Sequence, residues 1–453
     1  MGARPGGRIC GPCPRWWRLF SVAKRSVHFT NAWHGTSGGI RTFYEALLAG
    51  AEQHRRHLAL VVPGPKTSCQ RLGEFARIYS IRAPHSPVFD RRYRVLLPHR
   101  YVGASRSAVW RLLARERPDV VETCDKYALP FLNGLVKRRA GDGPRPTLIG
   151  LSCERMDDNI RAWLGYGRIA DAATRAYLRR VYLPLFDGHI ANSDYTAQEL
   201  RAIVDTYAAS DWRLRRLQSL IRVGPMGVDL DGFGPGRRSE AIRRQLLKGL
   251  GGRPDSTLLV YAGRVSPEKH VMGLPTMIQE LVARGVDARL IICGDGPLRA
   301  EMERTAALTA PGRIVVLGHV SRSTLAGILA SADVFVHPNP CEPFGIGPLE
   351  AMASGLPVVL PRAGGVLSYA TDANTWLTPP DAEGLAGGVR DLLARPMLTQ
   401  QRRAVALEDV KRLAWPAAVA TYFDHYDTID DARRSAPSAS RAFAGRGHLD
   451  RAF

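Results

Sequence analysis

Two glutamates on either side of a glycine-containing loop are the residues of this chain best suited to chemistry. Glu342 and Glu350 stand eight positions apart in the stretch E-P-F-G-I-G-P-L-E, with Gly345 and Gly347 between them. A carboxylate accepts two hydrogen bonds at once, so either side chain could bind the paired hydroxyls of a sugar or a ribose. Two glutamates taken alone more often cap or solvate a surface helix. The glycines and the flanking pattern favour a binding site instead.

The flanking residues predict where these carboxylates lie. Residues 333–337 form a short apolar run that ends at a proline, which predicts a strand opening into a loop. Pro348 fits the first turn of a following helix, which Gly355 ends before a second buried strand at residues 358–360. The N–H groups at the start of that helix, together with its dipole, suit a phosphate. One loop could therefore hold a sugar, a phosphate and a ribose in a row.

The longer stretch E-P-F-G-I-G-P-L-E-A-M-A-S-G-L-P-V-V resembles the E-x7-E signature of the retaining glycosyltransferases of family 4. That family has the GT-B fold, in which two Rossmann-like, doubly wound α/β domains face an interdomain cleft, and the resemblance extends from Val27 to about Ile429. It implies that Glu342 contacts the donor sugar and that Glu350 contacts the nucleotide ribose. The loop amides would bind the rest of the donor, the sugar hydroxyls at Phe344 and Gly345 and the phosphates at Ile346 and Gly347.

A second candidate cluster follows a strand predicted at residues 258–262. Arg264 and Lys269 stand five positions apart around a Ser-Pro helix start, where a guanidinium fork and an ammonium group could converge on one diphosphate. Either charge alone would usually be a surface residue, but the G-R-x-x-x-x-K spacing matches the resembled family. In that family the backbone at Val320 contacts the nucleotide base. The resemblance therefore makes Arg264 and Lys269 catalytic and donor-binding candidates beside Glu342.

The first half of the chain predicts a βαβ unit. A strand-like run at residues 27–31 leads through a loop into a helical stripe, and another strand follows at residues 58–62. Gly38 and Gly39 precede the helix, so their N–H groups could face an anion with no side chain in the way. Turns use such a pair for geometry more often than for ligands. In the resembled family this loop faces the donor phosphates, which makes both glycines donor-binding candidates.

A third candidate loop follows the strand predicted at residues 147–151, at the sheet edge where doubly wound folds place their sites. It contains Cys153, Glu154 and Arg155. Many members of the resembled family carry a histidine here, and this chain has Cys153 in its place. A cysteine neither hydrogen-bonds a hydroxyl as well nor titrates in the same range, so Glu154 or Arg155 could substitute. All three are acceptor-side candidates, and whether Cys153 replaces the histidine stays open.

The 453 residues are enough for two domains of roughly 200 residues each. We expect a basic, disordered extension at residues 1–25, an acceptor domain at 26–222 completed by a helix at 414–430, a nucleotide-sugar-binding domain at 223–412, and a disordered tail at 434–453.

Residues 224–233, in the predicted connection between the domains, are rich in glycine and aspartate. Asp229 and Asp231 form a D-x-D, which binds a divalent metal in the other glycosyltransferase fold. Turn formation explains aspartates among glycines more simply, so we expect no metal site.

The formal net charge of +21 predicts attraction to polyanions such as nucleotide diphosphates or an anionic membrane. Residues 91–117 interleave arginines with aromatic side chains, which indicates a solvated face, a membrane-surface patch or a site for an anionic acceptor.

Cysteine usage and hydropathy indicate the compartment. The seven cysteines are scattered and form no disulfide framework, and the C-x-x-C at Cys10 and Cys13 has no second pair to complete a zinc or redox site. No run of about 18 apolar residues or secretory signal stands out. We therefore expect a cytoplasmic protein that could contact the inner face of the membrane peripherally.

The resemblance implies a retaining hexosyltransferase. It would move a sugar from a nucleoside-diphosphate sugar to a hydroxyl of a lipid or glycan, in cell-envelope or polysaccharide biosynthesis. Arg264, Lys269 and the loop amides would stabilise the departing diphosphate, so neither a metal nor a cofactor is expected. No carboxylate for a covalent intermediate stands out, which favours attack on the same face as the leaving group. The donor base and sugar, the acceptor, the linkage and the oligomeric state stay open.

Two other functions are compatible with the same residues. A nucleotide-sugar epimerase of this architecture would alter the donor without any acceptor. A catalytically inactive basic protein would bind a membrane or, less expectedly, nucleic acid. The intact set of Glu342, Glu350, Arg264 and Lys269 argues against lost catalysis.

Overall fold

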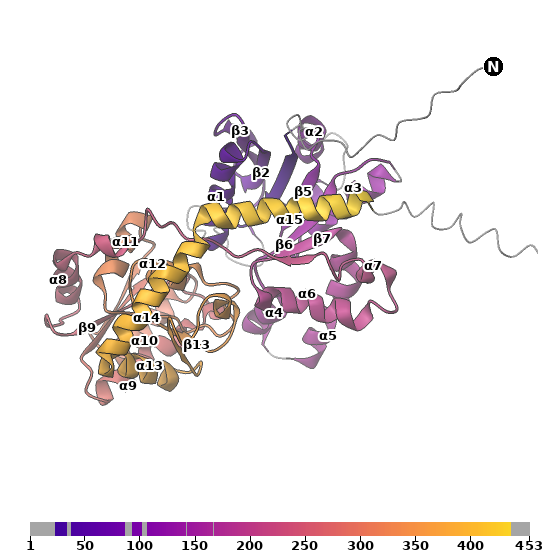
Figure 1. Cartoon of the computed structure of the whole chain (residues 1–453). Coiled ribbons are helices and arrows are strands. Elements are labelled where there is room, and N and C mark those ends of the chain that lie inside the picture. The colour runs from indigo at the N-terminus through magenta and orange to yellow at the C-terminus, as the bar shows by residue number, and fades with distance from the viewer. Residues whose placement is uncertain are drawn as a thin grey trace, which may run out of the picture.

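The structure is a computed structural model that describes residues 23–33, 38–86, 93–101, 107–141, 143–165 and 167–435. Two sheets, each flanked by helices, divide these residues into two α/β halves that lie side by side (Figure 1). The tail predicted beyond residue 435, nearly all of the predicted N-terminal extension and parts of the basic run at 91–117 lie outside the described residues.

Within the described residues, the first sheet has eight strands in the order β3-β4-β2-β1-β5-β6-β7-β8. Neighbouring strands run parallel except β3 and β4, which are antiparallel. The strands are β1 (Arg25–Thr30), β2 (His57–Gly64), β3 (Ser68–Arg71), β4 (Ala76–Arg82), β5 (Val120–Cys124), β6 (Thr147–Ser152), β7 (Gly188–Ala191) and β8 (Ile221–Val223). The central strands are short, almost fully buried runs, as expected for a sheet covered on both faces.

The second sheet has six parallel strands among the described residues, in the order β11-β10-β9-β12-β13-β14. They are β9 (Thr257–Ala262), β10 (Ala288–Cys293), β11 (Ile314–Gly318), β12 (Val334–Val336), β13 (Val358–Pro361) and β14 (Trp376–Thr378). In each sheet the winding reverses beside a central strand, between β1 and β5 in one and between β9 and β12 in the other. Open α/β sheets bind ligands at the carboxyl ends of the strands next to such a reversal.

Helices connect the strands and cover both sheets (Figure 1). In the first half they are α1 (Gly39–Gln53), α2 (Ala108–Glu116), α3 (Pro130–Ala140), α4 (Met156–Leu164), α5 (Arg168–Tyr177), α6 (Asp194–Tyr207) and α7 (Trp212–Arg215). In the second they are α8 (Glu240–Gly249), α9 (Leu274–Ala283), α10 (Arg299–Thr309), α11 (Arg322–Ser331), α12 (Ile346–Ala353), α13 (Ala382–Ala394) and α14 (Pro396–Asp409).

The sequence predicted a helix that begins at Ser266-Pro267, and this prediction is wrong. Pro267–Lys269 form only a 3₁₀ turn, and α9 begins at Leu274. His270 lies between them with φ of 53°, in the left-handed region that interrupts a right-handed helix. Lys269 therefore sits on a tight turn instead of on a regular helix.

The last helix, α15 (Trp415–Ser435), returns from the second half and lies across the first (Figure 1). Its buried Tyr426 donates a hydrogen bond to Glu122 of β5. The same carboxylate accepts from Tyr44 at 2.7 Å and lies 3.0 Å from Nδ1 of His28. A buried carboxylate is costly unless such partners surround it. The network therefore connects α15 to β5 in the centre of the first sheet.

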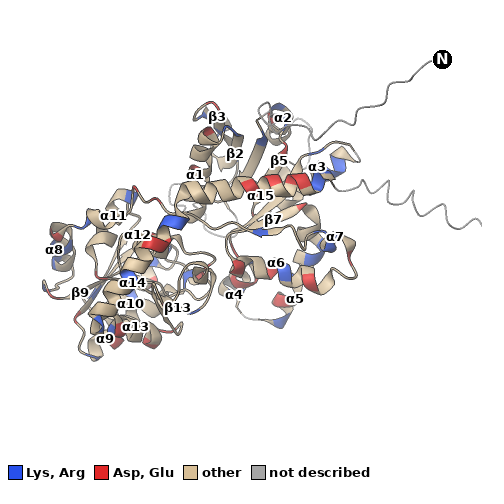
Figure 2. Cartoon of the chain, viewed as in Figure 1, with Lys and Arg blue, Asp and Glu red and all other residues tan. Residues whose placement is uncertain are grey.

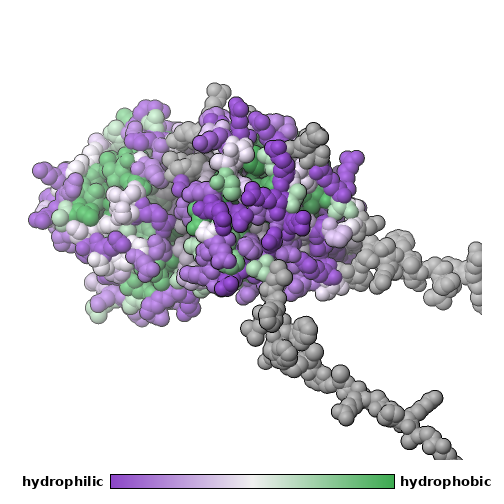
Figure 3. Space-filling view, turned by 90° about the horizontal axis from the view of Figure 1, so that it is seen from above, coloured by the Kyte–Doolittle hydropathy of each residue, from purple (hydrophilic) through white to green (hydrophobic). Residues whose placement is uncertain are grey.

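Basic and acidic side chains lie on helices of both halves (Figure 2). The face seen in Figure 3 is mainly hydrophilic, with smaller hydrophobic areas. Among the helices that the structure describes, none is long and apolar enough to cross a bilayer.

Candidate active site

A cavity of about 1250 Å³ lies between the two halves. It is lined by the segments that follow β1, β5 and β6 in the first sheet and β9 and β12 in the second. Every candidate site residue from the sequence lies on its wall: Gly38, Gly39, Cys153, Glu154, Arg155, Arg264, Lys269, Val320, Glu342, Phe344, Gly345, Ile346, Gly347 and Glu350. The fold thus brings together groups that are more than 300 positions apart in the sequence.

Glu342 is held by several hydrogen-bonding partners in this cavity. Its two oxygens accept hydrogen bonds from Nζ of Lys269 at 2.9 and 2.7 Å, and Oε2 also accepts from Nδ2 of Asn339 at 3.0 Å. Nε2 of His337 lies 3.2 Å from the same oxygen. Burial raises the pKa of Glu342, but Lys269 and His337 lower it by more, so the net pKa is well below its ordinary value. Glu342 is therefore ionised at neutral pH.

Lys269 and Glu342 also contact each other directly, a pairing that the sequence did not predict. The pair forms because β9 and β12, whose ends carry these residues, are neighbours in the sheet. Asn339 and His337 were missed for the same reason. Their position after a predicted strand was visible in the sequence, but their contact with Glu342 depends on the path of the loop.

Arg264 also follows β9, and it reaches toward the opposite half. Its guanidinium carbon lies 5.0 Å from the centre of the Tyr93 ring. A cation over an aromatic face at this distance is attracted by the ring. The contact therefore links the two walls of the cavity at a residue expected to bind the donor.

Glu350 lies in α12 in different surroundings from Glu342. Its Oε1 is 3.5 Å from Nη2 of Arg322, and that nitrogen is 3.8 Å from Oδ2 of Asp229. Nη1 of Arg322 donates to Oγ1 of Thr42 in the opposite half at 3.2 Å. Burial raises the pKa of Glu350 to about 7, which Arg322 opposes and Asp229 reinforces. Arg322 was not predicted from the sequence, since nothing in its local pattern separates it from a surface arginine.

The backbone of the loop before α12 requires glycine. Gly345 has φ of 91°, and a Cβ atom there would lie 2.8 Å from the hydroxyl of Tyr369. The first N–H groups of α12, at Ile346 and Gly347, belong to the helix turn that has no intrahelical acceptors. Across the cavity, a Cβ atom on Gly39 would lie 2.8 Å from Cδ1 of Ile346. The two walls thus approach each other closely where phosphates were expected.

The D-x-D in the connection forms a turn. Oδ1 of Asp229 accepts the N–H of Gly232 at 2.9 Å, and the carbonyl of Asp231 accepts from Arg237. In the part of the chain that the structure describes, no group of three or more His, Cys, Asp or Glu side chains is placed to bind one metal ion.

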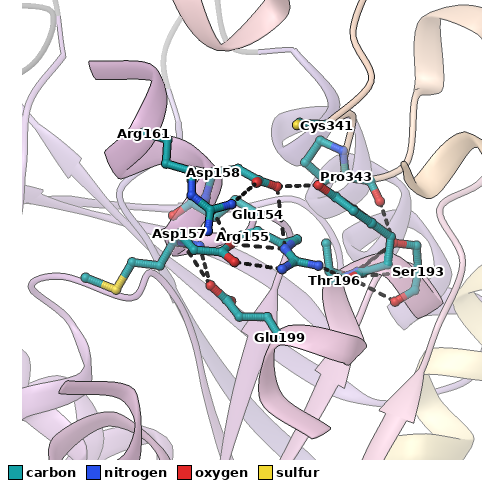
Figure 4. Close-up of polar contacts among 12 residues, drawn as sticks. Glu154, Arg155, Asp157, Asp158, Arg161, Ser193, Thr196, Glu199, Cys341 and Pro343 are labelled. Atoms are coloured by element: carbon teal, nitrogen blue, oxygen red, sulfur yellow. Dashed lines mark hydrogen bonds and ion pairs between the residues drawn. The ribbon is translucent and has the colours of Figure 1, made fainter. Parts of the chain in front are cut away.

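The first half supplies a dense polar network on its wall of the cavity (Figure 4). Nε and Nη2 of Arg155 donate to Asp157 at 3.0 and 2.7 Å, and Nε lies 3.5 Å from Asp158. The guanidinium carbon also lies 4.6 Å from the centre of the Tyr195 ring. Arg155 is therefore committed to partners within its own half.

Cys153 is buried in the same wall. A hydrogen bond with Cys153 and burial raise the pKa of the neighbouring Cys124 thiol. Cys124, Cys153 and Cys341 are free thiols. Cys124 and Cys153 thus lie buried side by side, at the end of β5 and just after β6.

Two doubly wound halves with a cavity between them define the GT-B class of glycosyltransferase folds. Solved structures support this class. A sucrose-phosphate synthase from Thermosynechococcus elongatus superposes with a TM-score of 0.67 at 18% identity, covering 90% of this chain and 100% of that one. At that identity the likeness shows the fold, as predicted from the sequence.

Sequence comparisons show the family. Residues 243–407 match the model of the glycosyl transferases group 1. The chain is 31% identical over 404 residues to a GDP-mannose-dependent alpha-(1-6)-phosphatidylinositol dimannoside mannosyltransferase of Mycobacterium tuberculosis, covering 88% of this chain and 94% of the relative. It is 30% identical over 353 residues to a D-inositol 3-phosphate glycosyltransferase of Catenulispora acidiphila, covering 74% and 72%. The chain belongs to the group 1 glycosyltransferases and is a hexosyltransferase, which confirms the predicted enzyme class.

Proposed function

We propose that this enzyme is a retaining glycosyltransferase of family 4 that transfers mannose from GDP-mannose to a hydroxyl of a phosphatidylinositol mannoside. The observation that carries the proposal is the Lys269–Glu342 pair on the wall of a cavity that residues of both halves line. The donor and acceptor are those named for a relative that matches 88% of the chain, and the inositol-phosphate enzyme supports an inositol-containing acceptor.

In this proposal each donor group has its own partners. The ionised Glu342 accepts hydrogen bonds from mannose hydroxyls, and Glu350 accepts them from the ribose. Arg264, Lys269 and the first amides of α12 stabilise the diphosphate as negative charge develops on it. The amides of Phe344 and Gly345 contact the sugar, the backbone at Val320 contacts the base, and Gly38 and Gly39 approach the phosphates from the opposite wall.

The reaction proceeds without a covalent sugar–enzyme intermediate and without a metal or other cofactor. The acceptor oxygen attacks the anomeric carbon on the face from which the diphosphate departs. The bond between that carbon and the phosphate oxygen breaks, and its electrons leave with GDP. The acceptor hydroxyl proton passes to the departing phosphate oxygen, so the products are the α-mannoside and GDP. We place the enzyme in the cytoplasm, peripheral at the inner face of the membrane, where such a lipid acceptor is reached.

The test is transfer by the purified chain. We expect GDP-mannose and phosphatidylinositol mannosides in detergent to give a lipid with one more mannose, detected by mass spectrometry, whose anomeric configuration matches the donor by NMR. Activity in EDTA tests the absence of a metal requirement. UDP-glucose and ADP-glucose serve as donor controls. An inverted product, or an altered sugar nucleotide formed from the donor alone, would refute the proposal, and the second outcome would indicate an epimerase.

A further inference from the structure

We propose that Glu154 is the residue that binds the attacking hydroxyl of the acceptor. This inference rests on the proposed function, and it selects one of the three acceptor-side candidates. Glu154 follows β6 on the wall of the cavity that belongs to the first half, opposite the loop that contains Glu342. Any acceptor that reaches the donor sugar from this half passes that wall.

The carboxylate of Glu154 has one oxygen held in place and one available. Oε2 accepts a hydrogen bond from Nδ2 of Asn159 at 2.7 Å. Oε1 has no hydrogen-bond partner among the described residues and is not shielded from the cavity. A carboxylate oxygen in that position is a strong acceptor for a substrate O–H.

The backbone that carries Glu154 is fixed by a buried ion pair. Nζ of Lys126 donates to the main-chain carbonyl of Glu154 and to the carboxylate of Glu199. The side chains of Lys126 and Glu199 are only 1% and 4% exposed. Oε1 of Glu199 also accepts the N–H groups of Met156 and Asp157 at 2.7 and 3.1 Å. A carboxylate on so well anchored a loop can orient a hydroxyl with little loss of entropy.

The neighbouring polar side chains are already satisfied (Figure 4). Arg155 is engaged by Asp157, and its Nη1 donates to the carbonyl of Tyr195 at 3.3 Å. Asp158 accepts the hydroxyl of Tyr195 and lies 3.7 Å from Nη1 of Arg161. Oε1 of Glu154 is therefore a carboxylate oxygen of this loop with an open hydrogen-bonding position toward the cavity.

The surroundings of Glu154 also make the binding of the acceptor hydroxyl by its carboxylate dependent on pH. Burial raises its pKa to about 7, which the charge of Lys126 and the hydrogen bond from Asn159 oppose. The other titratable groups that act on it or are acted on by it are Asp125, Glu199, Tyr127 and Cys124. The ionised form accepts the hydroxyl hydrogen bond, and that form becomes more populated as the pH rises through about 7. In the same-face reaction the proton itself still leaves with the diphosphate.

The experiment compares Glu154→Gln and Glu154→Ala with the wild type and with Asp171→Asn. Asp171 is an ion-paired carboxylate of the same half that does not line the cavity, so its variant is a matched control. We measure kcat and KM for phosphatidylinositol mannosides, GDP binding, and hydrolysis of GDP-mannose in the absence of acceptor.

We expect both Glu154 variants to lower kcat/KM for the acceptor by about 10- to 100-fold, as for loss of a hydrogen bond to a charged group. GDP binding and donor hydrolysis should stay within about twofold of the wild type. With GDP-mannose saturating at every pH, the wild-type kcat/KM for the acceptor should rise with pH through about 7, and this rise should be absent in Glu154→Gln.

An unchanged acceptor KM and pH profile in Glu154→Gln would overturn the inference. So would a parallel loss of GDP binding, because that outcome indicates a structural role. A wild type that transfers to no phosphatidylinositol mannoside would instead overturn the proposed function, and this inference with it.

Discussion

At the residue scale, the two buried glutamates Glu342 and Glu350 ionise differently because their neighbours differ. Glu342 is surrounded by Lys269, Asn339 and His337, which keep it ionised in spite of its burial. Glu350 is equally buried but faces one arginine at 3.5 Å, so its pKa rises to about 7. Burial favours the neutral acid, and nearby cations favour the carboxylate. One side chain is thus a fixed negative charge, and the other titrates near neutral pH.

We expect Glu342→Gln to lower kcat by about 100-fold or more, because it removes the charge that we propose acts on the reacting sugar. Lys269 then loses its ion-pair partner but stays close to the cavity, so folding should change little. The measurement is steady-state transfer beside a thermal melt of the same preparation. Near-normal transfer would remove Glu342 from the donor site, and a large loss of melting temperature would make the activity loss uninformative about chemistry.

The titration of Glu350 leads to a prediction about nucleotide binding. In the proposed function ribose hydroxyls donate to the carboxylate, so a protonated Glu350 must lose its proton when GDP binds. With a pKa of about 7, affinity should fall as the pH is lowered, and GDP should bind about tenfold more weakly at pH 6 than at pH 8. Calorimetry at both pH values checks this. In Glu350→Gln the affinity should be lower and the same at both pH values, and a retained tenfold difference would contradict the assignment.

The sequence was most informative where a residue's task depends on the local backbone. Glu342, Glu350 and the glycines between them were predicted because strand, loop and helix signals surround them. The partners were not predictable. His337 reaches Glu342 through the path of a loop, and Arg322 reaches Glu350 from a different helix. Such contacts depend on strand order and helix placement, which no local pattern contains.

At the element scale, the cavity wall formed by the second half depends on the tight turn from β12 into α12. The left-handed backbone of Gly345 turns the chain from β12 into the helix while the Tyr369 hydroxyl donates to its carbonyl at 2.6 Å. This turn places Ile346 and Gly347, the first residues of α12, on the wall of the cavity. The sequence predicted the element and its glycines, but it placed a helix start at Pro267 that proved to be a 3₁₀ turn. A Ser-Pro pair fits the start of an α-helix as well as the start of a 3₁₀ turn.

We expect Gly345→Ala to cost about 1–3 kcal/mol of stability, since alanine is strained at φ of 91° and its Cβ would contact Tyr369. The displaced loop should also raise the KM for the donor several-fold. Gly387→Ala is the matched control, because Gly387 lies exposed within α13 with open space around it. The Gly387→Ala substitution should leave the free energy of unfolding unchanged or raise it slightly. Equal melting temperatures for the two variants would refute the argument.

The hydrogen bond between Tyr426 of α15 and Glu122 of β5 leads to a second prediction at the element scale. Tyr426→Phe removes one hydrogen bond from the buried Glu122, which keeps Tyr44 and His28. Leaving a charged group partly unsatisfied should cost about 1–3 kcal/mol of unfolding free energy. Denaturant unfolding of the first half is the readout. Tyr177→Phe, which removes a hydroxyl bonded to the carbonyl of Lys126 instead of to a carboxylate, should cost less.

At the scale of the whole molecule, the site exists only because the two halves meet. The hydroxyl of Ser193, at the N-terminus of α6, donates to the carbonyl of Pro343 beside Glu342. Arg322 donates to Thr42, and Arg264 lies over Tyr93, so further contacts cross between the walls. Each of these contacts involves a residue of the donor wall or its immediate neighbour. A change in the relative position of the halves would therefore move residues of the cavity wall.

The net charge of +21 acts on the same scale, because it determines which surfaces attract the molecule. Each basic residue near an anionic bilayer contributes about 1 kcal/mol, and salt screens the attraction. The first 25 residues alone contain six Lys or Arg and no Asp or Glu. A lipid acceptor would place the enzyme where this attraction is useful. The charge and the proposed acceptor therefore lead to one expectation, reversible binding to anionic membranes.

We expect the full chain to sediment with phosphatidylcholine vesicles that contain phosphatidylglycerol, and not with phosphatidylcholine alone. Binding should weaken by at least about tenfold when the salt rises from about 0.05 to 0.5 M, since screening shortens the reach of each charge. A variant lacking residues 1–22 should bind more weakly, because it has lost four arginines. Equal binding to both kinds of vesicle, or binding that salt does not change, would show that apolar contacts and not charge hold the enzyme at the membrane.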